Sequence, residues 1–169
     1  LLYGAGLGPL SPRGWAKCTA ALNKCADTLV FRERESLAAA REHGINAPEL
    51  ILGADGAAET SVSAAPRENV LFVCPRRGCG APPFPTEYAR AAAEIAAKRG
   101  WKLRYIAMNV RQDLPLCRAL VSETGGEAAA APEDTVALAR LFASARLTVS
   151  MRLHALTLSY LCLLYTSPS

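Results

Sequence analysis

Three arginine residues each follow a predicted β-strand, and this placement gives them the clearest potential for chemistry. In an open parallel sheet, ligands bind beyond the carboxyl ends of the strands. A guanidinium group donates two parallel hydrogen bonds to a phosphate or carboxylate group. The arginines therefore indicate a site for a small polyanion, and the alternative is an ordinary solvent-exposed strand end. They are Arg32 after strand 28–31, Arg76 after strand 70–73 and Arg152 after strand 147–151.

Arg152 and His154 stand together at the predicted start of the last helix. A first helical turn favours an anion, and a cation there opposes the helix dipole unless an anion binds beside it. Imidazole takes up and releases protons near neutral pH, which suits a proton shuttle. We therefore predict that Arg152 binds an anion and that His154 acts in acid–base chemistry. The other histidine, His43, stands in the last turn of a predicted helix, where a cation suits the dipole, and we interpret it as structural.

A glycine-rich segment, residues 4–10, follows the strand-like start of the chain. Gly6 and Gly8 would let the backbone approach a phosphate group closely. The segment lacks the GxGxxG spacing of a dinucleotide-binding turn, and it lacks the Lys-Ser/Thr pair of a P-loop. Alone, it is a weak indication of a phosphate site. Asp55, which follows a further strand, is most simply interpreted as a helix cap.

Predicted strands and helices alternate along the chain, which predicts an α/β fold with Rossmann-like parallel sheets and right-handed crossovers. Within one of these helices we expect Thr86 to be the N-cap and Gly100 to follow the end, with Arg90 and Glu94 paired on the outer face. Short apolar runs predict strands at 28–31, 49–52, 70–73, 103–108 and 147–151, and helices are expected at 34–43, 86–99 and 113–121, among others.

The composition excludes several classes of protein. The 169 residues carry a formal net charge of +4, and 51% are hydrophobic, which argues against a disordered chain and against a general nucleic-acid binder. No apolar run reaches the roughly 18 to 20 residues that a membrane-spanning helix needs. The six cysteines show no metal-ligand spacing and indicate reduced thiols in a cytoplasmic protein, so no metal is expected. Cys18 and Cys25 share one face of a predicted helix, which favours core packing.

Several short motifs, taken in order, resemble the polysaccharide pyruvyl transferases of the CsaB type. The resemblance runs over residues 2–158. Three mild departures are Leu7 where isoleucine is usual, Glu33 where aspartate is usual, and Gly56 where proline is expected. The matching segments are YGAGLGPL at 3–10, ADTLVFRERES at 26–36, GI at 44–45, AD at 54–55 and MRLHAL at 151–156.

The resemblance implies two Rossmann-like domains in a GT-B-like architecture. Residues 1–57 would form the C-terminal part of the first domain, 58–67 a linker, and 68–169 most of the second. Independently of the resemblance, the chain abandons the preceding helical pattern from Leu161 on, so residues 161–169 are a candidate for a foreign tail. We expect a chain truncated at both ends, which would be inactive by itself.

The resemblance also implies a reaction. The enzyme would move the pyruvyl group of phosphoenolpyruvate onto sugar hydroxyls of a cell-surface polysaccharide, as a cyclic ketal and without a cofactor. Arg152 would bind the donor, Arg76 or Arg32 would be a second clamp, and His154 would be the acid–base catalyst. Gly6 and Gly8 would contribute to substrate binding. The acceptor would be a sugar or a lipid-linked saccharide, and the latter would bring the enzyme to a membrane surface.

Two other interpretations remain open. One is a GT-B-like glycosyltransferase that uses a nucleotide sugar, and the other is an inactive truncated fragment that binds anions weakly. Nucleotide-sugar enzymes of this fold usually keep a carboxylate for the ribose in the second domain. No clear candidate for that carboxylate stands between Leu103 and Arg152, which favours the pyruvyl donor. The carboxylates in that range, all in predicted helices or loops, are Asp113, Glu123, Glu127, Glu133 and Asp134.

Overall fold

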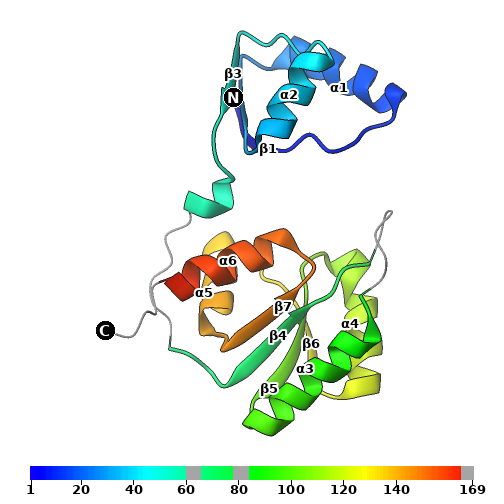
Figure 1. Cartoon of the computed structure of the whole chain (residues 1–169), viewed down its shortest axis with the longest axis vertical. Coiled ribbons are helices and arrows are strands. Elements are labelled where there is room, and N and C mark those ends of the chain that lie inside the picture. Colours follow the sequence, from blue (N-terminus) through cyan, green and yellow to red (C-terminus); the bar gives the residue numbers. More distant parts are fainter. Residues whose placement is uncertain (60–65, 78–83, 165–169) are drawn as a thin grey trace. The chain divides into compact units, whose positions relative to one another are not determined.

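The computed structural model describes residues 1–59, 66–77 and 84–164. It divides the chain into two compact units, Leu1–Glu59 and Thr60–Ser169 (Figure 1). Of the predicted linker 58–67, residues 60–65 lie outside the described residues, as do residues 165–169 of the predicted tail. Each unit is an α/β layer structure with a parallel sheet, so the predicted Rossmann-like fold class is confirmed.

The first unit has a three-stranded parallel sheet in the order β1-β2-β3. The central strand β2 carries the core of this unit, because Leu29 and Phe31 are fully buried against residues of the α2 region such as Ala40 and Ile45. In chain order the elements are β1 (Leu2–Ala5), α1 (Pro12–Cys25), β2 (Thr28–Phe31), α2 (Arg34–Glu42), β3 (Glu49–Leu52) and the short 3₁₀ helix η1 (Gly56–Glu59).

The second unit has a four-stranded parallel sheet in the order β6-β5-β4-β7. Its elements are β4 (Val70–Cys74), α3 (Thr86–Arg99), β5 (Lys102–Ala107), α4 (Val110–Thr124), β6 (Glu127–Ala130), α5 (Thr135–Ser144), β7 (Leu147–Ser150) and α6 (Leu153–Leu164).

Strand β4 shows why this second sheet is covered on both faces. All five of its residues are buried, and side chains of a strand alternate between faces. Leu71 and Val73 pack in one apolar cluster with residues of α3 and α4, and Phe72 packs in another with residues of α5 and α6. Figure 1 shows these two pairs of helices on opposite sides of the sheet.

The strand order also places a topological switch point in the second unit. From β4 the chain steps outward to β5 and β6, and it then returns to the other side of β4 as β7. The last residues of the two strands, Cys74 and Ser150, are partners in the register of the sheet. Ligands of open α/β sheets bind beyond the carboxyl ends of the strands at such a point. The residues that follow β4 and β7 are therefore the first place to look for a site.

Several local expectations need correction. Thr86 is the first residue of α3 and Pro85 precedes it as the cap residue, without a side-chain cap. Arg90 pairs with Glu123 of α4 and not with Glu94. The helix expected at 113–121 begins earlier, at Val110, because the side chain of Asn109 caps it.

Gly44 and Gly100 have positive φ angles of 72° and 64°, which confirms both as residues that end helices. Helix α6 continues to Leu164, whereas the sequence pattern indicates a break near Leu161. Cys25 is exposed and Cys18 is half-buried, so the prediction of core packing is wrong for Cys25.

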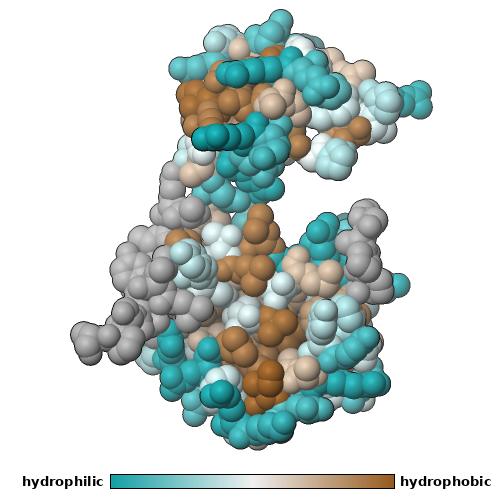
Figure 2. Space-filling view, viewed as in Figure 1, coloured by the Kyte–Doolittle hydropathy of each residue, from teal (hydrophilic) through white to brown (hydrophobic). Residues whose placement is uncertain are grey.

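The surface of each unit mixes hydrophilic areas with apolar patches, as Figure 2 shows for one side. Exposed large apolar residues of the second unit include Leu147 on the edge strand β7 and Leu153 and Tyr160 on α6. Among the described residues, none of the helices combines the length and the apolar character needed to cross a bilayer.

Candidate functional site

The switch point of the second unit brings Arg152 close to the loop that follows β4. Arg152 is the residue before α6, and its side chain is 20% exposed. Its Nη2 donates a hydrogen bond to Oδ1 of Asp113 at 2.6 Å, and its Nε donates to Oδ2 at 3.0 Å. The backbone N–H of Arg77 donates to the same Oδ1 at 3.2 Å. One carboxylate therefore joins the two strand ends from which the predicted site residues extend.

A short turn after β7 fixes the backbone at the start of α6. The hydroxyl of Ser150 accepts a hydrogen bond from the backbone N–H of Arg152 at 2.8 Å and donates to its carbonyl oxygen at 3.0 Å. Two residues later, His154 lies in the first turn of α6 and is exposed. The imidazole therefore lies within one helical turn of an arginine whose backbone and side chain are both held. This arrangement suits an anion bound next to a proton donor.

The charges around the switch point are mainly positive. Arg76 is half-buried and Arg77 is exposed in the loop after β4, and Arg152 follows β7. Asp113 balances one of these three cations and is itself fully buried. Within the described part of the chain, Arg152 is the one member of the three with an ion pair at this edge, so the edge favours an anionic ligand.

Two buried cysteines near this edge are poor nucleophiles. Burial raises the pKa of the Cys74 thiol to about 12, although a hydrogen bond with Ser150 opposes the shift. Burial likewise raises the pKa of the Cys117 thiol to about 12, and the charge of Asp113 adds to the effect. A nucleophilic cysteine needs its thiolate form at neutral pH. We therefore assign no covalent chemistry to these thiols.

We expect the native protein to show a large contrast in cysteine alkylation. At pH 8, a thiol with a pKa of about 12 is ionised in about one molecule in ten thousand, and Cys74 and Cys117 are also buried. Exposed Cys25 should react with iodoacetamide at least about a thousandfold faster than either buried thiol. Peptide mass spectrometry after timed labelling measures this ratio. Labelling of Cys74 at the rate of Cys25, without denaturant, would contradict the burial of the thiol.

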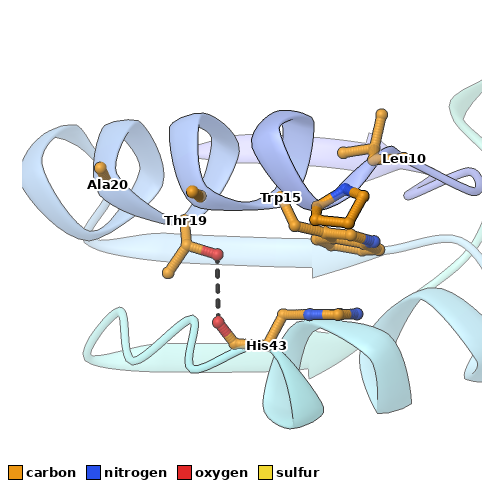
Figure 3. A pocket seen from close by; sticks show the side chains of 7 residues that line it. Leu10, Trp15, Thr19, Ala20 and His43 are labelled. Atoms are coloured by element: carbon orange, nitrogen blue, oxygen red, sulfur yellow. Dashed lines mark hydrogen bonds between the residues drawn. The ribbon is translucent and has the colours of Figure 1, made fainter.

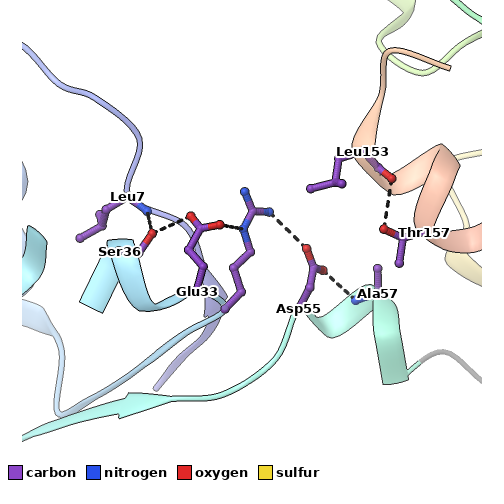
Figure 4. A network of polar contacts seen from close by, with 8 residues as sticks. Leu7, Glu33, Ser36, Asp55, Ala57, Leu153 and Thr157 are labelled. Atoms are coloured by element: carbon purple, nitrogen blue, oxygen red, sulfur yellow. Dashed lines mark hydrogen bonds and ion pairs between the residues drawn. The ribbon is translucent and has the colours of Figure 1, made fainter. Parts of the chain in front are cut away.

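In the first unit, Arg32 lies between two carboxylates. Its Nη1 donates a hydrogen bond to Oδ2 of Asp55 at 3.2 Å, and its Nε is 3.7 Å from Oε2 of Glu33 (Figure 4). The side chain of Arg32 is 28% exposed, and its buried Nε has no hydrogen-bond partner among the described residues. Asp55 also accepts a hydrogen bond from the backbone N–H of Ala57 at 3.0 Å, which confirms its role as a helix cap for η1. A phosphate group would therefore have to compete with the carboxylates of Asp55 and Glu33 for the guanidinium group of Arg32.

The glycine-rich segment is held against this arginine. A Cβ atom built at Gly6 would lie 2.8 Å from Nε of Arg32, so the guanidinium group rests on a backbone without a side chain. The backbone N–H of Leu7 donates a hydrogen bond to the hydroxyl of Ser36 at 2.7 Å, and this hydroxyl donates to Oε1 of Glu33. A Cβ atom at Gly8 would meet no heavy atom within 4 Å. The two glycines therefore have different surroundings, and only Gly6 is needed for packing.

This difference predicts different effects for two matched substitutions. Gly6→Ala should lower the free energy of unfolding by about 0.5–1.5 kcal/mol, because the guanidinium group of Arg32 must turn away from the new methyl group and weaken its hydrogen bond to Asp55. Gly8→Ala should change it by less than about 0.5 kcal/mol, because its Cβ has free space. Thermal and urea unfolding of the two variants measure the difference. Equal stabilities would show that Gly6 does not support Arg32.

His43 packs against a residue of the first unit, Trp15. Its ring stacks on the indole of Trp15, with ring centroids 3.8 Å apart and an interplanar angle of 13°. Its carbonyl oxygen accepts a hydrogen bond from the hydroxyl of Thr19 at 3.1 Å (Figure 3). These contacts connect the end of α2 to α1, as expected of a histidine with a structural role.

Parallel sheets in Rossmann-like units, with arginines at the switch point of one of them, are typical of α/β enzymes that bind small phosphorylated substrates. Residues 1–162 match the sequence profile of a family described as polysaccharide pyruvyl transferase. The chain belongs to this family, and it is therefore a transferase. Comparisons with curated proteins and with solved structures found no match.

Asp113 is the residue of this site that the sequence does not single out, because it is one of five carboxylates between Leu103 and Arg152 with no clear role. Its contacts reach Arg152, 39 positions along the chain, and Arg77, 36 positions away, so no local spacing indicates them. A carboxylate four positions after the Asn109 cap looks like an ordinary first-turn acid, which suits the helix dipole. Complete burial of this carboxylate is the feature that distinguishes it, and burial depends on the tertiary fold.

Proposed function

We propose that the enzyme transfers the pyruvyl group of phosphoenolpyruvate to two hydroxyl groups of a sugar in a polysaccharide or its precursor, forming a cyclic ketal. Membership of the polysaccharide pyruvyl transferase family supports the group transferred and the class of acceptor. The observation that supports the donor is the placement of Arg152 at the start of α6, beside the loop that carries Arg76. Phosphoenolpyruvate carries a phosphate and a carboxylate, and both groups suit guanidinium donors.

The arginines divide the binding of the donor between them in this proposal. Arg152 is held by Asp113 at the switch point and binds one anionic group, with help from the first-turn N–H groups of α6. Arg76, after the neighbouring strand β4, is the second clamp. It is favoured over Arg32, which has carboxylates of Asp55 and Glu33 beside it.

The proposed reaction needs proton transfers that a histidine performs well. A proton added to the methylene carbon of the donor makes the neighbouring carbon electrophilic. One sugar hydroxyl attacks that carbon, and a second hydroxyl closes the ketal as the C–O bond to phosphate breaks. The two hydroxyls release two protons, of which one replaces the proton given to the methylene carbon and the other leaves with inorganic phosphate. His154, in the first turn of α6, is the proposed acid–base group.

The reaction is tested with the purified full-length enzyme, phosphoenolpyruvate and a panel of saccharide acceptors. Phosphorus NMR should show release of inorganic phosphate that depends on the acceptor, and carbon NMR should show the quaternary carbon and methyl group of a ketal. A matched reaction with nucleotide sugars should give no nucleoside diphosphate. Transfer of a glycosyl group from a nucleotide sugar, without use of phosphoenolpyruvate, would contradict the proposal and support the glycosyltransferase interpretation.

A further inference from the structure

The contacts of Asp113 are unusual for an acidic residue in the first turn of a helix. Its side chain is 0% exposed, and its two oxygens accept four hydrogen bonds. Two come from the guanidinium group of Arg152, one from the backbone N–H of Arg77 and one, at 2.9 Å, from the backbone N–H of Asn109. A carboxylate has room for about four donors, so its accepting capacity is filled. Asp113 therefore has nothing left with which to bind a substrate.

We propose that Asp113 is a positioning residue of the donor site, which acts by fixing the direction of the Arg152 side chain. This inference rests on the proposed function, in which Arg152 binds the donor. Asp113 accepts from Nε and from one N–H of Nη2, so it uses two of the five donors of the guanidinium group, and the two N–H groups of Nη1 and the second N–H of Nη2 can meet an anion. With 20% of the Arg152 side chain exposed, its position is set within the protein and not by solvent.

The same carboxylate also fixes the second element of the site. Its bond from the backbone N–H of Arg77 attaches the loop after β4, which carries Arg76, to the start of α4. The ends of β4 and β7, and the start of α4, are thus connected by one buried side chain. A displacement of about 1 Å at a binding group can cost an enzyme about a hundredfold. Because Asp113 contacts both Arg152 and the loop that carries Arg76, its loss should displace these groups and weaken donor binding.

A purely structural ion pair makes a different prediction from a positioning role. Each would lower stability when the carboxylate is replaced. A residue that acts mainly through Arg152 changes donor binding much more when Arg152 is present than when Arg152 is absent. The dependence of the effect on Arg152 is therefore the decisive measurement.

The test is Asp113→Asn in the full-length enzyme, alone and in an Arg152→Ala background. All four partners of the carboxylate are N–H donors, and the amide nitrogen of asparagine is itself a donor that cannot accept from them. The guanidinium group of Arg152 should therefore lose its fixed direction. In the wild-type background we expect the KM for phosphoenolpyruvate to rise about tenfold or more, with kcat changed less than about threefold. In the Arg152→Ala background only the bond to the loop that carries Arg76 remains, so we expect Asp113→Asn to raise the KM by less than about threefold.

A control shows what loss of stability alone does to the enzyme. Asp134 caps α5, where its Oδ1 accepts the backbone N–H of Ala137 at 2.7 Å, and its side chain is exposed. Asp134→Ala should therefore lower the melting temperature and leave the KM unchanged. If Asp113→Asn does not fold, Asp113→Glu keeps the charge and displaces the carboxylate by one methylene group, and the same rise in KM is expected. A wild-type KM in whichever variant folds, or an equal rise in both backgrounds, would overturn the positioning role.

Binding of inorganic phosphate, measured by titration calorimetry, separates this proposal from the proposed function. Weaker phosphate binding by Asp113→Asn supports the positioning role, even if the enzyme does not consume phosphoenolpyruvate. Turnover of phosphoenolpyruvate with unchanged phosphate affinity and KM in Asp113→Asn supports the proposed function and contradicts the positioning role. A wild-type enzyme that binds neither phosphate nor phosphoenolpyruvate would contradict both.

Discussion

Replacement of His154 by alanine is expected to lower kcat about 10²- to 10⁴-fold, with a small change in the KM for phosphoenolpyruvate. The imidazole lies in the first turn of α6, two residues after an arginine held in place by Asp113 and by the Ser150 turn. In this position it would meet a donor bound at Arg152. General acid–base groups contribute to the transition state and not to ground-state binding, so the loss should fall on kcat. Steady-state kinetics with the full-length enzyme measure it.

The second histidine of the chain provides a matched control for His154. His43→Ala removes a ring that stacks on Trp15, so it should lower the melting temperature and leave both kcat and KM unchanged. His154→Gln gives a further comparison, because the amide donates hydrogen bonds but does not exchange protons near neutral pH. It should be as inactive as the alanine variant. A His154→Ala enzyme with normal kcat and reduced stability would show that this residue packs the helix and that the proposed mechanism is wrong.

The sheets of this protein are largely predictable from the sequence. Strands β2, β3 and β4 match short apolar runs closely. For β4, and for three of the four residues of β2, the reason is burial, because a strand covered on both faces needs no polar alternation. Strand β3 keeps its apolar run at the edge of its sheet, although Ile51 and Leu52 are exposed. The strand β6 (Glu127–Ala130) has three alanines and no large apolar residue, so its sequence gives little signal. It forms through hydrogen bonds with β5 at the edge of the sheet.

The site is only partly predictable, for a different reason. Arg76 and Arg152 were found because each follows a predicted strand, and a strand end has a local signal. Strands β4 and β7 are neighbours in the sheet because of the strand order, which pairs residues that are 76 positions apart in sequence. Asp113, Glu123 and Asp55 each pair with an arginine at least 23 positions away in sequence. Such pairs are consequences of the fold, so periodicity and spacing contain no information about them.

These pairs also change how the positive charge of Arg152 is explained. In sequence, a cation at a helix N-terminus requires an anion nearby. The structure supplies one such anion within the protein, because Asp113 pairs with Arg152. The argument for a bound substrate therefore no longer rests on the charge of this one residue. It rests on Nη1 of Arg152, which is not among the nitrogens that donate to Asp113, and on the excess of arginines among the described residues of the switch point.

Replacement of Arg152 by alanine is expected to raise the KM for phosphoenolpyruvate about 10- to 150-fold, since a charge-assisted hydrogen bond contributes about 1.5–3 kcal/mol. The same change leaves the carboxylate of Asp113 buried without a counterion, which should lower the free energy of unfolding by about 3–5 kcal/mol. Arg152→Lys keeps the charge but not the planar fork, so it should restore the KM only partly. Kinetics and urea unfolding of each variant measure the two effects separately.

The double variant Arg152→Ala/Asp113→Asn separates the role of Arg152 in binding from its role in stability. Without a buried charge, this variant should recover part of the stability that Arg152→Ala loses. Its KM should remain as high as that of Arg152→Ala, because the guanidinium group that contacts the donor is still absent. Recovery of a wild-type KM together with stability would mean that Arg152 serves only to neutralise Asp113. In that case donor binding would have to be assigned to other residues of the strand ends, with Arg76 as the first candidate to replace.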